Sequence, residues 1–151
     1  MRAPDLCPDG AFSGAKLLLT CGEDLLTYLR DDFAHIPFPA FWDLPGGGRE
    51  GEEAPIDCAL RELFEEFGLI LDPKRLSGQP FASHHQPGFV SWLFRGQLTL
   101  SEIAAIRFGD EGQEWRMMPL SDFINHPRAV PHFREWVRHA LANGPEFQPG
   151  P

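Results

Sequence analysis

The sequence has few of the residues that mark several common protein classes. Its three cysteines, Cys7, Cys21 and Cys58, form no C-x-x-C pair and are odd in number. Neither a disulfide framework nor a zinc site is therefore indicated, and this cysteine usage favours a reducing cytoplasm. The formal net charge is −9 and no basic run is present. A nucleic-acid polymer is consequently not expected as a partner, because nothing would neutralise its phosphates.

Long hydrophobic runs are also missing. Leu17-Leu18-Leu19 is far too short to span a bilayer, and residues 1–10 contain Asp and Pro but no long apolar stretch, so we expect neither a membrane segment nor a signal peptide. Apolar content of 42% and charged content of 23% are ordinary for a globular protein. The length favours one domain over residues 1–142, followed by a flexible Gly- and Pro-rich tail over 143–151.

Turn-forming residues divide the sequence into short segments. Gly22 separates two apolar stretches, which predicts a β-hairpin, and Gln86-Pro87-Gly88 separates a second pair of strands. Pro55 suits the first turn of a helix, and Gly68 suits its C-terminal cap. These signals predict strands over 15–21, 24–30, 41–44, 76–85, 89–98 and 114–120, helices over 55–67, 101–106 and 131–141, and a loop over 31–40.

The predicted 55–67 helix has an apolar face and a carboxylate face. Its apolar side has the spacing of a helix packed on a sheet. Glu62, Glu65 and Glu66 stand at i, i+3 and i+4, so all three project from one face, and no lysine lies within the segment. Such a cluster of oxygen ligands suits a hard divalent cation. Taken alone, however, an E-x-x-E-E cluster is more typical of a solvated helix face.

The wider spacing changes this assessment. Five residues separate Gly47 from Glu53, and seven more separate Glu53 from the segment RELFEEFGL over 61–69. These seven fixed positions would coincide by chance about once in 10⁸ starting points. The arrangement resembles the Nudix box, G-x5-E-x7-R-E-U-x-E-E-x-G-U, where U is apolar, and no fixed position departs from that pattern.

The resemblance implies a fold, a reaction and a cofactor. The implied fold is α/β with mixed α+β character, a Nudix-type α/β/α sandwich around a mixed β-sheet. The implied reaction is metal-dependent hydrolysis of a nucleoside diphosphate linked to another group, with Mg²⁺ as cofactor and Mn²⁺ as an alternative. The implied metal ligands are Glu62, Glu65, Glu66 and a main-chain carbonyl at Gly46 or Gly47, and the three glutamates also count as catalytic.

Supporting roles follow from the same resemblance. Gly46, Gly47 and Gly48 would most often be a tight turn, but in the family this loop lets the backbone approach metal and substrate phosphate. Arg61 is implied to pair with Glu53 and so fasten the loop to the helix. The alternatives are a phosphate clamp for Arg61 and metal ligation for Glu53.

A general base is expected outside the box. The segment GDEGQEW over 109–115 resembles the E-G-Q-x-x-E-W loop of MutT-like members, although it is shorter. Glu111 is thereby implied as a further metal ligand or as the base that deprotonates water, and an ordinary acidic loop is the alternative. Glu114 and Glu65 are the other candidates for the base.

The substrate is less well defined. The length resembles MutT-like members and favours a (deoxy)nucleoside triphosphate, which would give a nucleoside monophosphate and pyrophosphate. ADP-ribose or another nucleoside-diphosphate derivative is the first alternative. The single tyrosine, Tyr28, lies upstream of the box, which disfavours diadenosine polyphosphates. Val130 lies where MutT-type enzymes carry a base-reading asparagine, so oxidised guanine is not indicated. The aromatic residues that could stack a base are Phe38, Phe41, Trp42, Trp92 and Trp115.

An inactive ligand-binding module with a Nudix fold is the second alternative. Such modules usually have broken boxes, whereas Glu53, Glu62, Glu65 and Glu66 are all present here, which favours an enzyme. His84 and His85 follow a strand and could face the site, but paired histidines there are more often surface or hydrogen-bonded groups. The other four histidines show no metal-ligand spacing, and none of the six is assigned a role. We expect a monomer or homodimer acting on a small nucleotide.

Overall fold

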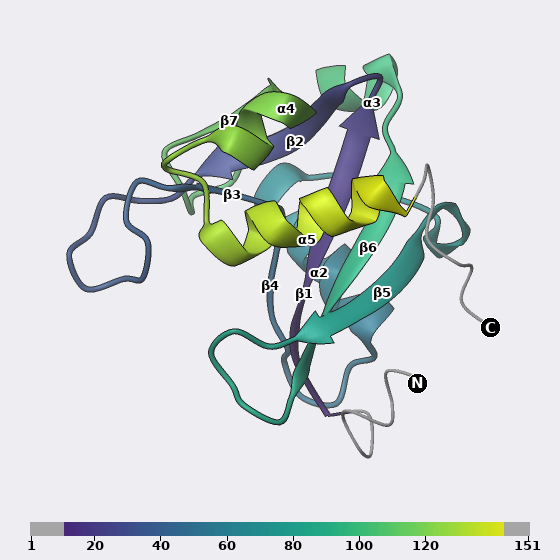
Figure 1. Ribbon diagram of the computed structural model, residues 1–151. Coiled ribbons are helices and arrows are strands. Elements are labelled where there is room, and N and C mark those ends of the chain that lie inside the picture. The colour runs from purple at the N-terminus through teal and green to yellow at the C-terminus, as the bar shows by residue number, and fades with distance from the viewer. Residues whose placement is uncertain (1–10, 144–151) are drawn as a thin grey trace.

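The computed structural model describes residues 11–143, which form one mixed seven-stranded sheet with helices on both faces (Figure 1). This confirms the expected mixed α/β/α sandwich. Except for Asn143, the predicted tail lies outside the described residues. The elements are β1 (Phe12–Cys21), β2 (Asp24–Leu29), β3 (Trp42–Asp43), β4 (Gly46–Gly48), α2 (Pro55–Phe67), η2 (Pro73–Arg75), β5 (Ser77–Ala82), β6 (Val90–Gln97), α3 (Leu100–Ala104), β7 (Glu114–Pro119), α4 (Leu120–Asn125) and α5 (Pro131–Ala142).

Strand β1 organises the sheet. The main strand order is β3-β2-β1-β6-β5, with β4 paired to β1 and β7 paired to β2. Strands β1 and β6 run parallel, and the remaining strand pairs are antiparallel. The pairing of Ala15 with Gly47 and of Lys16 with Gly46 places the glycine strand beside the middle of β1. Residues far apart in the sequence therefore meet around β4.

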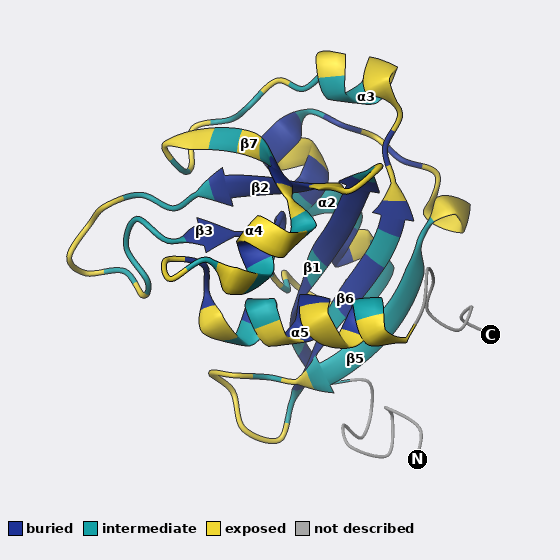
Figure 2. Ribbon diagram, turned by 45° about the horizontal axis from the view of Figure 1, so that its top comes forward, coloured by how far each residue is buried: buried dark blue, intermediate teal, exposed yellow. Residues whose placement is uncertain are grey.

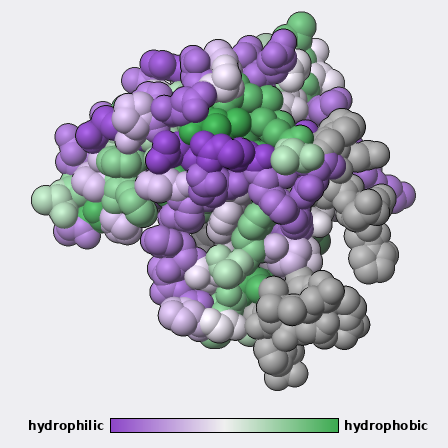
Figure 3. All heavy atoms as spheres, viewed as in Figure 1, coloured by the Kyte–Doolittle hydropathy of each residue, from purple (hydrophilic) through white to green (hydrophobic). Residues whose placement is uncertain are grey.

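Alternation along β1 produces two hydrophobic cores. Leu17 and Leu19 belong to the core beneath α2, while Leu18 belongs to the core beneath α4 and α5. Figure 2 shows β1 and β6 largely buried between these layers. The outer face of α5 is hydrophilic (Figure 3), as expected for an amphipathic helix that covers a sheet.

Helix α2 begins and ends at the predicted residues. Pro55 occupies its first turn, and Gly68 caps it with φ 69° while donating its N–H to the Phe64 carbonyl at 2.9 Å. Leu63 and Phe67 are fully buried on the predicted apolar face. Burial of this face fixes the rotation of the helix, and it therefore also fixes where the glutamates project.

The glycine segment differs from the prediction. Gly46–Gly48 was expected to be a loop between a strand and the helix, but it forms strand β4. Gly46 has φ 126°, and a Cβ there would lie 2.1 Å from the Ala15 carbonyl oxygen, so this position requires glycine. Propensity did not reveal the strand because glycine is a poor strand former, and the pairing with β1 is a long-range contact.

The other predicted helices and strands are present, but their lengths differ from the prediction. The two hairpins, the 101–106 helix, the 114–120 strand and the closing helix are present, with shorter strands β5 and β6. The prediction missed α4, because Leu120 was assigned to the preceding strand, and it missed the single turn η2. Within residues 11–143, no helix is both long and apolar enough to cross a membrane.

Candidate active site

Strand β4 and helix α2 bring glycine backbone against two carboxylates. The Gly46 N–H donates to Glu66 Oε1 at 2.8 Å. A Cβ on Gly47 would lie 2.2 Å from Glu62 Oε2, so the absence of a side chain at residue 47 makes room for the Glu62 carboxylate. The predicted proximity of the glycine segment, Glu62 and Glu66 is therefore present.

Both carboxylates are shielded from solvent to a degree that is unusual for charged groups. Glu66 is 8% exposed, and burial raises the pKa of its carboxyl to about 8, although the Lys16 charge and the Gly46 N–H act in the opposite direction. Burial also raises the pKa of Glu62, while the Arg61 charge lowers it. Two desolvated carboxylates side by side with a single nearby lysine would be stabilised by further positive charge.

Arg61 connects the helix to the loop before it. Its Nε donates to Glu53 Oε2 at 3.0 Å, and its Nη2 donates to Glu53 Oε1 at 2.8 Å and to the Gly48 carbonyl at 2.8 Å. The predicted Arg61–Glu53 contact is thus present as a bidentate pair. Hydrogen bonding from Arg61 lowers the pKa of Glu53 to about 2.

Glu65 is the most exposed of the three helix carboxylates. Its side chain is half exposed, and its Oε1 lies 3.2 Å from Arg61 Nη1. Within the described part of the chain, no group of three His, Cys, Asp or Glu side chains is arranged to hold a metal ion. The same Arg61 Nη1 lies 3.4 Å from Glu62 Oε2, so the guanidinium stands between the Glu62 and Glu65 carboxylates.

Glu111 lies in the loop over 107–113, which rests on the C-terminal end of α2. Arg107 and Gly109 donate their N–H groups to the Phe67 and Glu66 carbonyls, both at 2.9 Å. Glu111 is exposed, and its charge is one of the minor contributions that raise the pKa of Glu62. Glu114 begins β7 opposite Leu29 and lies 3.5 Å from Arg116 Nη2, so it belongs to the sheet.

Sequence reasoning missed a buried charge cluster on the other side of β4. Asp43 is 1% exposed and accepts hydrogen bonds from the Tyr28 hydroxyl at 3.0 Å and from Arg30 Nη1 at 2.9 Å. Lys16 Nζ lies 3.2 Å from Asp43 Oδ1 and donates to the Gly46 carbonyl at 3.1 Å. These residues are isolated in the sequence and meet only through strand pairing, so no local signal could have found them.

A cavity of about 310 Å³ adjoins the carboxylates, because Gly47, whose backbone lies against Glu62, also lines the cavity. Phe38, His84 and His132 line its aromatic part, and the two imidazoles stack with their centroids 4.1 Å apart and their planes within 5°. Burial lowers the pKa of His132 to about 4, so this ring is neutral at pH 7. Of the aromatic residues suggested for base stacking, Phe38 is the one that lines this cavity.

A glycine-rich strand thus lies against a carboxylate-bearing helix within an α/β/α sandwich. The family model for the NUDIX domain matches residues 14–140. The chain belongs to the Nudix family and is a Nudix hydrolase.

Several known proteins are similar to this chain. The RNA pyrophosphohydrolase of Bartonella henselae is 26% identical over 149 residues, which cover 86% of this chain and 78% of that protein. The MutT protein of Methanosarcina mazei Go1 superposes with a TM-score of 0.70 at 19% identity, covering 91% of this chain and 99% of that one. A bifunctional NMN adenylyltransferase/ADP ribose pyrophosphatase from Francisella tularensis, complexed with AMP and a Mn ion, superposes with a TM-score of 0.69 at 19% identity. The match covers 91% of this chain and 43% of that one. At these identities, the two structural similarities show the fold.

Glu66→Gln should remove a pH-dependent loss of stability in metal-free protein. Because the pKa of Glu66 is raised in the fold to about 8, the unfolded state releases its proton first, and the free energy of unfolding falls as pH rises from about 5 to 8. At pH 8 in EDTA, the variant should be more stable than wild type by about 1–3 kcal/mol. Denaturant unfolding at several pH values checks this, with the half-exposed Glu65→Gln as control. Parallel pH profiles for wild type and Glu66→Gln would contradict the burial argument.

Glu53→Gln should show the opposite pH dependence. The lowered pKa of Glu53, about 2, means that its ion pair stabilises the fold above about pH 5 and that this contribution is lost as pH falls towards 2. The variant should therefore be less stable than wild type at pH 7 and approach it near pH 3. Thermal unfolding at both pH values measures the difference, and the exposed Glu23→Gln serves as control. A stability gap that stays constant with pH would show that the ionisation of Glu53 does not stabilise the fold.

Proposed function

We propose that this chain hydrolyses a phosphoric anhydride bond in a small nucleotide, with a (deoxy)nucleoside triphosphate giving a nucleoside monophosphate and pyrophosphate. The observation that carries this proposal is that the aromatic cavity adjoins the carboxylate site. Gly47 lines the aromatic cavity and also lies against the Glu62 carboxylate, so a nucleoside in the cavity would direct its phosphates towards Glu62 and Glu66. A cavity of about 310 Å³ is at the small end of ligand pockets, which suits one nucleoside.

The residues present fit a divalent cation. Glu62 and Glu66 are desolvated carboxylates whose pKa values are raised by burial, and they lie beside the main chain of a glycine strand. These two glutamates and the Gly47 carbonyl would hold the ion, with Glu65 and Glu111 as further ligands. Mg²⁺ fits this oxygen-rich set, and Mn²⁺ fits it as well. When bound, such an ion neutralises phosphate oxygens and lowers the pKa of water.

The other residues of the site would hold the loop in place, accept a proton or contact the base. Arg61 holds Glu53 and the Gly48 carbonyl together, which fixes the loop relative to the helix. Glu111 is exposed beside the carboxylates and would accept the proton of the attacking water. Phe38 and the neutral His132 would contact the base, because flat, uncharged rings stack on a nucleobase at little desolvation cost.

A second candidate substrate is the 5′ end of RNA. It is favoured by the similarity to an RNA pyrophosphohydrolase over 86% of the chain. The net charge of −9 and the lack of a basic run argue against an extended RNA contact. A small nucleotide therefore remains the first proposal, and ADP-ribose is the alternative within that class.

Hydrolysis should depend strictly on divalent metal and favour small nucleotides. We expect Mg²⁺-dependent release of product from nucleoside triphosphates, with kcat/KM about tenfold or more above that for ADP-ribose and for a 5′-triphosphorylated RNA oligonucleotide. Excess EDTA should abolish turnover of all of them, because Glu62 and Glu66 lack the positive charge that they need. Product analysis by ion-exchange chromatography checks both points. Preference for the RNA would favour the second candidate, and full turnover in EDTA would overturn the metal mechanism.

Glu111→Gln should lower kcat by roughly 10²- to 10⁴-fold with little change in KM if Glu111 takes the proton from water. The acidic limb of the pH–rate profile should disappear in the same variant. Glu114→Gln is the matched control, because Glu114 belongs to β7 and pairs with Arg116. Recovery of activity by extra Mg²⁺ would instead identify Glu111 as a metal ligand, and unaltered kcat would transfer the role of base to Glu65.

A further inference from the structure

Two loops that are remote in the sequence meet beside the site. The loop over 31–40 starts at Asp31, whose Oδ2 accepts the N–H of Gly112 at 3.1 Å. The contact continues at the next residue, where the Gln113 N–H donates to the Leu29 carbonyl at 2.8 Å and its side-chain Nε2 donates to the Arg30 carbonyl at 2.9 Å. The segment that carries Glu111 is therefore hydrogen-bonded to the start of the 31–40 loop.

The Glu111 segment has little freedom between its two attachments. Gly112 has φ 86°, and a Cβ there would lie 2.9 Å from the Tyr28 ring and 3.1 Å from the Leu29 carbonyl oxygen. At the other end, a Cβ on Gly109 would lie 2.7 Å from the Glu65 carbonyl oxygen. Both glycines permit close backbone contact, so Glu111 lies between a fixed point on α2 and a fixed point at Asp31.

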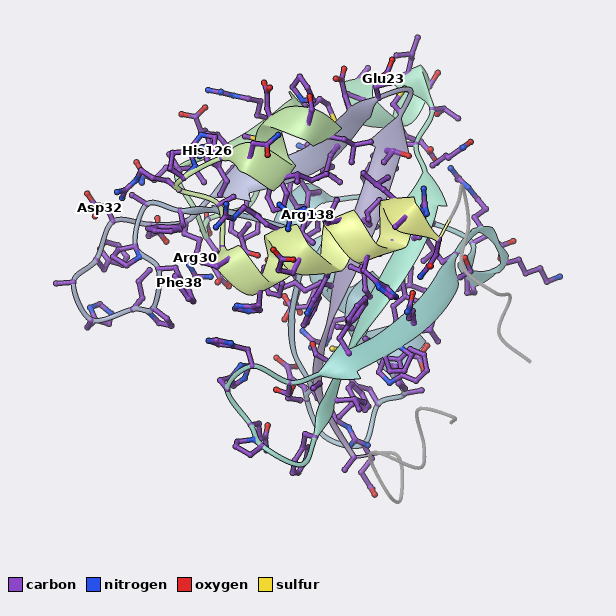
Figure 4. All side chains as sticks on the ribbon, viewed as in Figure 1. Glu23, Arg30, Asp32, Phe38, His126 and Arg138 are labelled. Atoms are coloured by element: carbon purple, nitrogen blue, oxygen red, sulfur yellow. The ribbon has the colours of Figure 1, made fainter. Side chains whose placement is uncertain are left out.

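The 31–40 loop connects the same Asp31 to the aromatic cavity. The Ala40 N–H donates to the Asp31 carbonyl at 3.0 Å, and Arg30 Nε donates to the Pro37 carbonyl at 3.0 Å, which closes the loop. Phe38 and Ala40 have φ of 49° and 58°, values that non-glycine residues rarely adopt and that are found at ligand clamps. Figure 4 shows Phe38 next to Arg30 at the base of this loop, while Asp32 lies at its outer side.

We propose that Asp31 is a positioning residue that holds Glu111 at the carboxylate site and couples its position to the loop over the nucleoside cavity. The inference rests on the proposed function, because it takes Glu111 to act in the reaction. A ligand that contacts Phe38 stabilises the closed 31–40 loop, and Asp31 transmits this to Gly112 through one charge-assisted hydrogen bond. Binding of the nucleotide thereby orders Glu111, the group proposed to accept the proton of the attacking water.

Amide exchange tests the coupling without any chemistry. Nuclear magnetic resonance of wild-type protein should show the Gly112 amide protected from exchange, with protection rising about tenfold when AMP is added. Asp31→Ala should lose both the basal protection and the response to AMP, whereas the exposed neighbour variant Asp32→Ala should behave as wild type. Asp31→Asn, which keeps an acceptor oxygen, should retain part of the response. An unchanged Gly112 amide in Asp31→Ala would overturn the proposal.

Kinetics test the consequence for the reaction. Asp31→Ala should lower kcat by about 10- to 100-fold, as is usual when a supporting partner of a reacting group is lost, with KM changed less than about twofold. Asp31→Asn should recover much of kcat, and thermal unfolding of each variant confirms that it is folded. Equal losses in Asp31→Ala and Asp32→Ala would overturn the proposal. If wild-type protein turns over no nucleotide, the proposed function fails, and the amide measurement still decides whether Asp31 couples the loops.

Discussion

The Arg61 guanidinium makes the contact on which the rest of the site depends. It donates to both oxygens of Glu53 and to the Gly48 carbonyl, and it lies 3.2 Å from Glu65. One planar group thus connects the strand, the following loop and the helix, and it offsets part of the repulsion among the glutamates. A lysine could not replace it, because a single ammonium cannot make the bidentate contact and reach the carbonyl as well.

A second set of contacts holds β4 from the opposite side. Asp43 is buried and shared between Lys16 and Arg30, while Lys16 also donates to the Gly46 carbonyl. Glycine has no side chain with which to anchor itself, so three consecutive glycines need such external contacts to hold one conformation. The same lysine lowers the pKa of Glu66 and so partly offsets the burial of that carboxyl. Lys16 therefore both supports strand β4 and lowers the pKa of Glu66.

Features that depend on residues close together in the sequence could be predicted, whereas features that depend on long-range contacts could not. Helix α2 was predicted with its observed ends because propensity, proline, glycine cap and apolar spacing all indicate the same segment. The Arg61–Glu53 contact could be predicted because the family pattern fixes its spacing. Strand β4 and the Lys16–Asp43 pair could not, since both depend on strand pairing across long separations. The exposure of Glu65 could not be predicted either, because the Arg61 guanidinium is shared among Glu50, Glu53, Glu62 and Glu65 and only their geometry decides how.

Local charge, and not the net charge of −9, determines what this site can bind. Lys16 and Arg30 line the nucleoside cavity but share the Asp43 carboxylate, so together they leave about one positive charge there. In their ionised forms, Glu62 and Glu66 oppose any phosphate that extends from the cavity. In the proposed function, an anionic nucleotide and a divalent cation therefore favour each other's binding, because each supplies the charge that the other lacks. By thermodynamic reciprocity, the factor by which metal strengthens nucleotide binding equals the factor by which nucleotide strengthens metal binding. The acidic helix thus makes nucleotide affinity conditional on the ion.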